Sequence, residues 1–321
     1  MTTRPGNGSD SASLEYTFKY NPPMDHAVAE RNLKEAKQIL DNAGIVFLLF
    51  SGACLGAVRD SAFIQWDDDI DLLSVMGIND LSEERLLAAV KIFRENGYFV
   101  KELKGSYSRA LSMIKDYVRI GWDADYIVED TLKVYPGITM PAKLFTNPKE
   151  IDFLGEKFLV PNPPEEYLRL KYGSEWTIPK RAGEYEKDVV AKIPDAKLIG
   201  QPARIRVLDY HDQPVFGAEV AVVGGSRSDT NSSGYAEIIL PGPDFYALTV
   251  SYPGHQQVLY MEEIEPRMTY IYRAMADIDV TGENTITSGT MPQDFSEGLM
   301  QLNDIVTSPN HAMKKSESDR E

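Results

Sequence analysis

Residues 50–73 read FSGACLGAVRDSAFIQWDDDIDLL and place a cluster of negative charge inside an otherwise apolar stretch. The cluster consists of Asp67, Asp68, Asp69 and Asp71. If residues 68–75 form a strand, side chains alternate between its two faces, so the first, third and fourth of these aspartates share one face and Asp68 lies on the other. Carboxylates held this close repel one another, and one takes up a proton unless a cation neutralises them.

A hard divalent cation is the natural neutraliser of such a cluster, because Mg²⁺ and Mn²⁺ prefer oxygen ligands. We therefore predict a Mg²⁺ or Mn²⁺ site formed by Asp67, Asp69 and Asp71. Paired aspartates of this form can hold two metal ions roughly 4 Å apart, which activate an attacking oxygen and stabilise a leaving one. The alternative is a solvated acidic loop or a helix cap, and the flanking apolar residues Trp66 and Leu72 argue against it.

The turn that precedes the cluster has the features of a phosphate site. Ser51 and Gly52 lie between a predicted buried strand at 45–50 and a short predicted helix. A small-residue turn at a helix N-terminus exposes backbone N–H groups, which suit a phosphate. Arg59 follows in the same helix as a fixed positive charge. Taken singly, each of these features is ordinary; their order before the aspartates predicts phosphate binding by Ser51, Gly52 and Arg59.

The rest of the chain suggests two domains, because 321 residues exceed one typical domain. Helical and strand-like segments mix up to about residue 190, and short alternating strands separated by turns follow. The predicted fold class is α+β: a mixed sheet with helices, then a small all-β sandwich. The expected parts are a mobile N-terminal arm at 1–20, the mixed domain at 21–190, a linker at 191–202, the sandwich at 203–273 and an acidic, disordered tail at 274–321.

Local signals support the helical segments of the first domain. Residues 82–96 predict a strong helix, with Ser82 as its N-cap and Gly97 as its terminator. Residues 163–173 predict a second helix, opened by proline and closed by glycine. Residues 132–139 are strand-like. All three segments follow the acidic cluster in the chain.

Composition narrows the class of protein. The net charge of −16 argues against a non-specific polyanion binder, so we expect no nucleic-acid partner. The single cysteine, Cys54, excludes an internal disulfide and a cysteine-rich zinc site. The N-terminal residues lack the apolar core of a signal peptide, and the longest apolar run, GIVFLLF, is too short to cross a bilayer. We expect a soluble, cytoplasmic protein without a membrane span.

The order of these features resembles the signature of the LicD family, whose usual form is close to G-T-L-L-G-A-V-R followed by F-I-P-W-D-D-D-I-D. Ala53 and Cys54 replace the usual Thr-Leu, and Gln65 replaces the proline. A second block, FLGEKFLVPNPPEEYLRLKYGSEWTIP, resembles the later segment of that family. The two blocks together cover about residues 25–180, in the order that the family has them.

The resemblance implies a nucleotidyltransferase fold and a metal-dependent transfer reaction. A substituted phosphate, such as phosphocholine or a polyol phosphate, would pass from a CDP-activated donor to a hydroxyl of a carbohydrate acceptor. Asp69 and Asp71 would be the two metal-binding carboxylates, with Asp67 as a further ligand or a supporting group. A third carboxylate would come from GWDADYIV, where the family pattern favours Asp125 over Asp123, either as a metal ligand or as the base for the acceptor hydroxyl.

Two basic residues near the sheet are further candidates. Lys115 and Arg119 are within reach of the donor's pyrophosphate in this interpretation. Charged residues beside a sheet edge also serve to prevent edge-to-edge pairing, which is the alternative for both. We include Lys115 with Ser51, Gly52 and Arg59 among the predicted phosphate-binding residues.

The C-terminal strands resemble carboxypeptidase regulatory-like or transthyretin-like modules. The resemblance lies in VLDYHDQPVFGAEVAVVGG and in the turn that follows it, TNSSGYAE. Such modules usually support, bind or dimerise, so this part implies little about activity and is compatible with a homo-oligomer formed through the sandwich.

Two other functions fit parts of the sequence. A metal-dependent glycosyltransferase would use the same aspartates to bind a nucleotide-sugar, although the turn before them favours a phosphate beside the metal. A non-catalytic glycan-binding protein would use the sandwich for binding and the first domain as a scaffold. Closely paired carboxylates are costly to keep without a use, which favours the enzyme.

Overall fold

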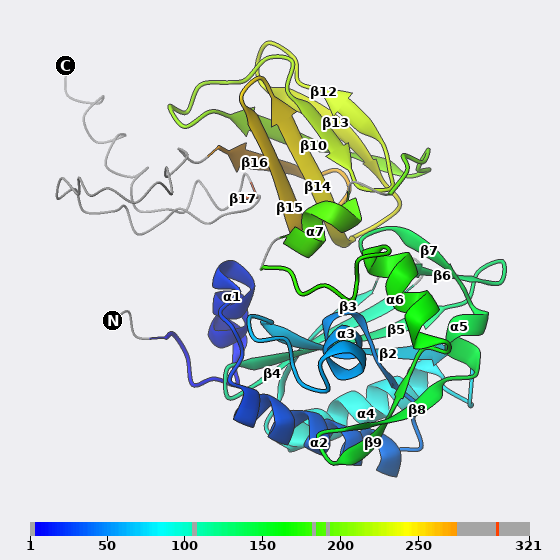
Figure 1. Cartoon of the computed structure of the whole chain (residues 1–321). Coiled ribbons are helices and arrows are strands. Elements are labelled where there is room, and N and C mark those ends of the chain that lie inside the picture. The colour runs from blue at the N-terminus through cyan, green and yellow to red at the C-terminus, as the bar shows by residue number, and fades with distance from the viewer. Residues whose placement is uncertain (1–3, 105–107, 182–183, 191–192, 275–299, 302–321) are drawn as a thin grey trace. The chain divides into compact units, whose positions relative to one another are not determined.

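The computed structural model describes residues 4–104, 108–181, 184–190, 193–274 and 300–301 (Figure 1). The chain divides into two compact units, Met1–Ile193 and Pro194–Glu321, each with its own apolar core. We describe each unit by itself.

The first unit is built on a five-stranded mixed sheet with the strand order β1-β2-β5-β4-β3. The strands are β1 (Leu48–Leu49), β2 (Asp69–Met76), β3 (Phe99–Lys104), β4 (Ser108–Lys115) and β5 (Val118–Tyr126). The central strands β2 and β5 are parallel, and the other neighbours in the sheet are antiparallel. The mixed sheet with helices that the sequence predicts is confirmed.

The first unit also contains helices, and side chains cap the N-termini of some of them. They are α1 (Ser11–Tyr20), α2 (His26–Asn42), α3 (Ser51–Arg59), α4 (Glu83–Glu95), α5 (Lys143–Thr146), α6 (Pro164–Tyr172) and α7 (Glu184–Val190). Asp25 caps α2 by accepting hydrogen bonds from two backbone N–H groups, and Ser82 caps α4 by accepting one from Arg85. Helices α2 and α4 contact each other and strands of the sheet. Helix α3 contacts β2 of the sheet and also helix α6 (Figure 1).

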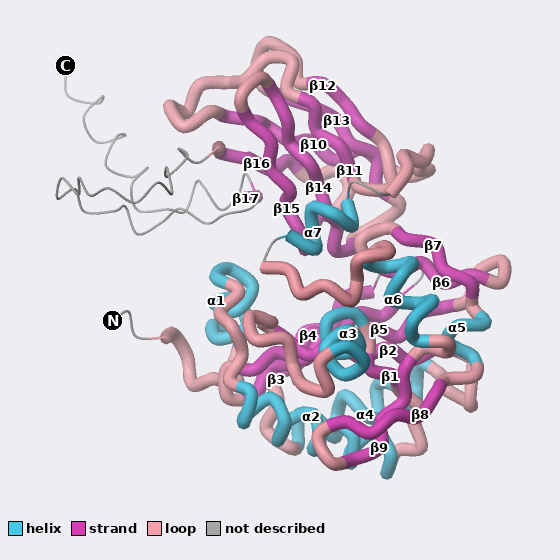
Figure 2. The backbone as a smooth tube through the Cα atoms, viewed as in Figure 1, coloured by secondary structure: helices cyan, strands magenta, loops and turns pink. Residues whose placement is uncertain are grey.

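Two hairpins complete the first unit (Figure 2). They are β6 (Thr131–Val134) with β7 (Ile138–Pro141), and β8 (Lys149–Phe153) with β9 (Glu156–Val160). The single strand-like stretch expected at 132–139 is therefore divided. Pro136 and Gly137 lie in the turn that separates its two halves, where proline removes a backbone donor and glycine adopts a positive φ of 139°.

Residues 4–20, the described part of the predicted mobile arm, are ordered against the rest of the first unit. Residues 11–20 form α1, in which the side chain of Asp10 accepts a hydrogen bond from the backbone N–H of Ser13. Leu14 and Thr17 of this helix are buried, and the backbone N–H of Tyr117 donates to the carbonyl of Gly8 at 2.8 Å. The segment is polar and small, which predicts mobility, yet Leu14 is buried and α1 contacts β4.

The second unit contains two four-stranded sheets, ordered β13-β10-β16-β17 and β12-β11-β14-β15. Its strands are β10 (Gln201–Leu208), β11 (Glu219–Val222), β12 (Arg227–Asp229), β13 (Tyr235–Leu240), β14 (Asp244–Tyr252), β15 (His255–Ile264), β16 (Thr269–Arg273) and β17 (Met300–Gln301). Alternate residues of both sheets, such as Ile205 and Val220, belong to one buried cluster. The unit is strand-rich as expected, and its likeness to a particular module stays a prediction.

One predicted domain boundary differs from the structure, and the predicted tail lies mostly outside the described residues. Strand β10 begins at Gln201, inside the predicted linker. Most of the predicted acidic tail lies outside the described residues, except that Ala274 is described and Met300–Gln301 pairs with β16. Within the described part of the chain, no helix combines the length and apolar character that crossing a membrane requires.

A buried hydrogen-bond chain links β2 to its neighbours and supports a first prediction. The hydroxyl of Ser74 donates to the carbonyl of Val46 at 2.8 Å and accepts from the indole Nε1 of Trp122 at 3.0 Å. Both side chains are fully buried. Ser74→Ala leaves the indole N–H without its acceptor, so we expect a loss of about 1–3 kcal/mol in the free energy of unfolding, measured by urea denaturation.

The same change at Ser112, also buried but outside this chain of hydrogen bonds, is the control. We expect it to cost clearly less. Equal losses in the two variants would show that the hydrogen bond from Trp122 to Ser74 does not contribute measurably to the free energy of unfolding.

Candidate active site

The register of β2 and β5 decides which side chains share a face of the sheet. Asp69 lies opposite Arg119, Asp71 opposite Gly121 and Leu73 opposite Asp123. Side chains of paired residues on neighbouring strands point to the same face. The acidic face therefore carries Asp69, Asp71, Arg119, Asp123 and Asp125.

The alternate residues point to the opposite face and form the core. Ile70, Leu72, Ile120 and Trp122 are almost completely buried. The ring of Trp122 contacts Phe93 of α4, with their centroids 6.0 Å apart. The apolar packing beneath the sheet thus fixes the aspartates above it.

Asp67, Asp68 and Asp69 converge in the structure. Each offers one carboxylate oxygen, and these oxygens lie within 4.8 Å of one another. Asp68 was expected on the opposite face, and that expectation is wrong. Alternation does not extend to it, because β2 begins only at Asp69 and the two preceding aspartates lie in the approach to the strand.

Arg119 is the counter-ion of two of these carboxylates. Its Nε and Nη2 donate to Oδ2 of Asp69 at 3.1 and 3.0 Å, and Nη2 also donates to Oδ2 of Asp68. Arg119 is 5% exposed, and its charge partly offsets the repulsion within the cluster.

Asp71 is held by the N-terminus of α3. The backbone N–H of Gly52 donates to Oδ2 of Asp71 at 2.9 Å, and the backbone N–H of Ser51 donates to the hydroxyl of Tyr167 at 3.0 Å. The helix N-terminus does bind an anion, as its partial positive charge favours, but the anion here is a carboxylate of the protein itself. Phosphate binding by these two amides stays a prediction. It requires the amides to leave Asp71 and Tyr167 and to donate to phosphate oxygens instead.

Gly52 also has a steric reason to be glycine. A Cβ atom at this position would lie 2.6 Å from Oδ2 and 3.1 Å from Oδ1 of Asp67. The backbone of α3 therefore approaches two aspartates at once, Asp67 by close contact and Asp71 by a hydrogen bond. The sequence pointed to the right residue but not to this reason.

Lys171 of α6 is a site residue that the sequence did not reveal. It is 5% exposed and donates from Nζ to the carbonyl of Tyr135 at 2.9 Å. Burial lowers the pKa of Lys171 to about 8, while the charges of Asp71, Asp123 and Asp125 act to raise it. The available signal was a lysine in the segment YLRLKY whose helical face is otherwise buried and apolar.

Negative charge is concentrated and buried at this site. Among the described residues, Asp68 and Asp69 share one cation, Arg119, and Asp71 lies near the positive charge of Lys171. Burial raises the pKa of Asp69 to about 8 and that of Asp71 to about 6. Oxygen ligands with concentrated negative charge fit a hard divalent cation.

The raised pKa values predict how stability depends on pH. Between about pH 4 and pH 8 the unfolded chain has released the proton of Asp69 while the folded chain retains it, so the folded state binds more protons. Stability must therefore fall as pH rises through this window, by at most about 1.4 kcal/mol per pH unit for one proton. We expect urea denaturation in EDTA to show this slope in the wild type and a smaller slope in Asp69→Asn.

Asp152→Asn, at an exposed position on β8, is the matched control and should keep the wild-type slope. Added Mg²⁺ should flatten the wild-type slope, because a bound cation favours the ionised carboxylates. Identical slopes for the wild type and Asp69→Asn would contradict the assignment of a raised pKa to Asp69.

The register bears on the choice between the two later aspartates. Asp123 lies two residues beyond Gly121, the partner of Asp71, and Asp125 lies four beyond it. At about 3.3 Å per residue, these positions are roughly 7 and 13 Å further along the strand. Asp123 is also the one of the two whose charge raises the pKa of Asp71. The sequence favoured Asp125; the register favours Asp123.

The remaining predicted residues have other partners. Arg59 donates through Nε to Asp60 at 2.8 Å, and its Nη1 donates to the hydroxyl of Tyr185. Lys115 donates to Glu35 and to the carbonyl of Asn96. Neither is brought into contact with the aspartates by these hydrogen bonds, and their phosphate-binding roles stay predictions.

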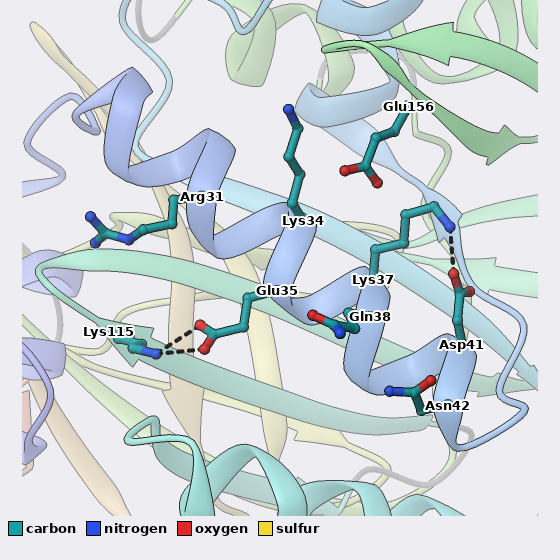
Figure 3. A pocket seen from close by; sticks show the side chains of 9 residues that line it. All are labelled: Arg31, Lys34, Glu35, Lys37, Gln38, Asp41, Asn42, Lys115 and Glu156. Atoms are coloured by element: carbon teal, nitrogen blue, oxygen red, sulfur yellow. Dashed lines mark hydrogen bonds and ion pairs between the residues drawn. The ribbon is translucent and has the colours of Figure 1, made fainter.

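Lys115 borders a groove along α2 instead (Figure 3). The groove has a volume of about 610 Å³, and none of the clustered aspartates lines it. The basic side chains that line it are paired with acidic ones, such as Lys115 with Glu35 and Lys37 with Asp41. The groove lining is Arg31, Lys34, Glu35, Lys37, Gln38, Asp41, Asn42, Lys115 and Glu156.

Comparison with known proteins assigns the part of the chain that holds this site. Residues 44–163 match the family described as LicD/FKTN/FKRP, nucleotidyltransferase domain. This range contains the acidic cluster, α3 and both parallel strands. Residues 44–163 are thus a LicD/FKTN/FKRP domain.

Named relatives share this part of the chain. The human protein Ribitol-5-phosphate transferase FKTN is 28% identical over 171 residues, which cover 50% of this chain and 35% of that protein. The mouse protein Ribitol 5-phosphate transferase FKRP is 23% identical over 172 residues, which cover 51% and 35%. The chain thus spans about a third of the length of these curated relatives.

Among solved structures, one similar chain is ANT(2″)-Ia in complex with adenylyl-2″-tobramycin. It is 15% identical, with a TM-score of 0.30, and the match covers 41% of this chain and 68% of that one. A likeness of this size supports no argument about fold or function.

Proposed function

We propose that this protein is a metal-dependent phosphotransferase that moves a substituted phosphate from a CDP-activated donor to a hydroxyl of a glycan. The named relatives favour ribitol phosphate as the cargo, because both are ribitol-phosphate transferases by name. The observation that carries the proposal is the convergence of Asp67, Asp68 and Asp69 within 4.8 Å, beside the helix N-terminus that holds Asp71. This arrangement lies inside the LicD/FKTN/FKRP domain.

The residues of the site fit a divalent cation. Their ligand atoms are carboxylate oxygens, two of the carboxylates share the guanidinium of Arg119, and burial makes the charge of Asp69 costly. Asp67, Asp69 and Asp71 would hold Mg²⁺ or Mn²⁺, with Asp68 as an additional candidate. A cation bound there would neutralise phosphate oxygens and polarise the phosphorus–oxygen bonds of the donor.

The chain's own groups then perform the transfer. The acceptor oxygen forms a bond to the phosphorus of the substituted phosphate, the bond between that phosphorus and the bridging oxygen breaks, and CMP leaves with the bonding electrons. A carboxylate on β5 takes the proton of the acceptor hydroxyl; Asp123 and Asp125 are the candidates. The amides of Ser51 and Gly52, together with Arg59, orient the donor's phosphates.

Gly121 gives the acceptor room beside these groups. It pairs with Asp71 across the parallel strands, and a Cβ atom there would meet no heavy atom within 4 Å. Open space next to the aspartate on the acidic face is where a hydroxyl must enter to reach the phosphorus.

A thermal-shift screen tests this proposal on the full chain. The compounds are CDP-ribitol, CDP-choline, CDP-ethanolamine and, for comparison, UDP- and GDP-sugars, each with and without Mg²⁺. We expect a CDP-linked compound to raise the melting temperature only when Mg²⁺ is present. Stabilisation by a nucleotide-sugar alone would favour the glycosyltransferase alternative, and stabilisation by glycans alone the binding protein.

A further inference from the structure

Arg119 combines features that its role as a counter-ion does not explain. It is the second residue of β5, directly after the turn that joins β4 to β5, and it lies opposite Asp69 in the parallel strand pair. Two of its nitrogens share a single oxygen, Oδ2 of Asp69, instead of forming two parallel bonds with both carboxylate oxygens. The guanidinium therefore lacks the bidentate contact that it can form, in which two nitrogens bind two separate oxygens of a carboxylate or a phosphate.

The third nitrogen of the guanidinium has no acceptor within the described part of the chain. Nη1 is buried and makes no hydrogen bond to any described residue. The Cζ atom of Arg119 lies 4.4 Å from the centroid of the Phe18 ring of α1, and this ring carries no oxygen or nitrogen that could accept a hydrogen bond. A buried donor without an acceptor is costly, so its presence beside a site for phosphate chemistry points to an acceptor that arrives with the substrate.

Arg119 and a divalent cation must compete for the same oxygens. Asp68 and Asp69 belong to the converging group of carboxylates, and both are bonded to Arg119. A cation on Asp69 Oδ2 would repel the guanidinium and remove its hydrogen bonds. The released guanidinium would then lie next to the cation, where a phosphate of the donor carries the opposite charge.

We propose that Arg119 exchanges partners during the binding cycle: a divalent cation displaces its guanidinium from Asp69, and the guanidinium then binds a phosphate oxygen of the donor. This inference rests on the proposed function, since it assumes that the aspartates bind a cation and that the donor carries a pyrophosphate. It assigns Arg119 a phosphate-binding role and makes the order of binding cation first, donor second.

Titration calorimetry of the full chain with Mn²⁺ alone tests the first half. Arg119→Lys keeps the positive charge but loses the forked contacts with Asp69, and Arg119→Gln loses the charge as well. We expect Mn²⁺ to bind roughly threefold more tightly to Arg119→Lys and about tenfold more tightly to Arg119→Gln than to the wild type, a change of about 1.4 kcal/mol in the second case. Arg109→Gln is the control. It removes an arginine of β4, in the same sheet, that pairs with Glu83 of α4, and it should bind Mn²⁺ as the wild type does.

Titration with CDP in saturating Mn²⁺ tests the second half. We expect both Arg119 variants to bind CDP at least tenfold more weakly than the wild type, while cytidine, which lacks phosphate, binds all of them alike. Opposite effects on the two ligands are the signature of partner exchange. A residue that only supports the fold would weaken both or change neither.

The outcomes separate this inference from the proposed function. If the wild type binds Mn²⁺ and CDP but the Arg119 variants bind Mn²⁺ no more tightly, or CDP no more weakly, partner exchange is overturned and the proposed function stands. If the wild type binds no Mn²⁺, both fail. Circular dichroism and urea denaturation verify folding, and Arg119→Lys decides the matter if Arg119→Gln does not fold.

Discussion

Asp71→Asn is expected to lower transfer of the substituted phosphate at least about a thousandfold, which corresponds to roughly 4 kcal/mol of transition-state stabilisation. Asparagine keeps the size of the side chain and an oxygen that can accept the hydrogen bond from the Gly52 amide. The change therefore removes the charge that would bind the cation while it preserves the local fold. CMP release from the CDP-activated donor, measured in the presence of Mg²⁺, checks the prediction.

Stability should move in the opposite direction in the same variant. Burial raises the pKa of Asp71 to about 6, so at pH 8 its ionised form costs the folded state free energy that asparagine does not. In EDTA at pH 8 we expect Asp71→Asn to be at least as stable as the wild type. Asp152→Asn, on an exposed strand, should change neither activity nor stability; loss of activity there as well would show that the assay reports general damage.

Gly52→Ala should have the second largest effect, about a hundredfold on transfer, through geometry and not charge. The added methyl group would lie 2.6 Å from Oδ2 of Asp67, closer than carbon and oxygen approach in folded proteins, so α3 or the carboxylate must shift. The backbone at Gly52 has no positive φ, and alanine is otherwise a good helix residue. Weaker Mn²⁺ binding by calorimetry and slower CMP release, with little change in urea denaturation, are the expected results.

Gly121→Ala is the matched control for that experiment. It places the same methyl group on the acidic face, where a Cβ atom meets no heavy atom within 4 Å. Its affinity for Mn²⁺ should stay within about twofold of the wild-type value. If Gly52→Ala binds Mn²⁺ equally well, the close approach of α3 to Asp67 has no role in cation binding.

The fold and the acidic cluster were predictable because their signals are local. The helix at 82–96 carries its own cap at Ser82 and its terminator at Gly97, and the structure places α4 between them. The aspartates that follow Trp66 likewise lie within a short stretch of sequence, and their clustering alone predicts a cation site. Signals of this kind need no knowledge of the tertiary fold.

The rest of the site depends on contacts between distant segments. Lys171 joins the aspartates from a helix a hundred residues later in the chain, and Arg119 joins them through a parallel strand pairing. Neither the register of that pairing nor the burial of a lysine can be derived from one sequence. Asp68 was misplaced for a related reason, since alternation was extended beyond the residue at which β2 begins.

The helix α1 shows the limit of composition as a guide. Residues 1–20 are polar and small on average, but three side chains, Ser13, Leu14 and Thr17, are enough to bury one face of the helix. Phe18 of the same helix covers Arg119. A segment predicted to be a mobile arm thus contacts a residue of the candidate active site.

The most direct measurement of the central claim is a ³¹P NMR assay of the full chain with CDP-ribitol, Mg²⁺ and a glycan acceptor. The account predicts that the donor pyrophosphate signals are replaced in equal amounts by CMP and by a phosphodiester on the acceptor, and that EDTA or Asp71→Asn abolishes the change. Transfer of sugar from a UDP- or GDP-sugar, with no phosphodiester formed from any CDP-activated donor, would contradict it.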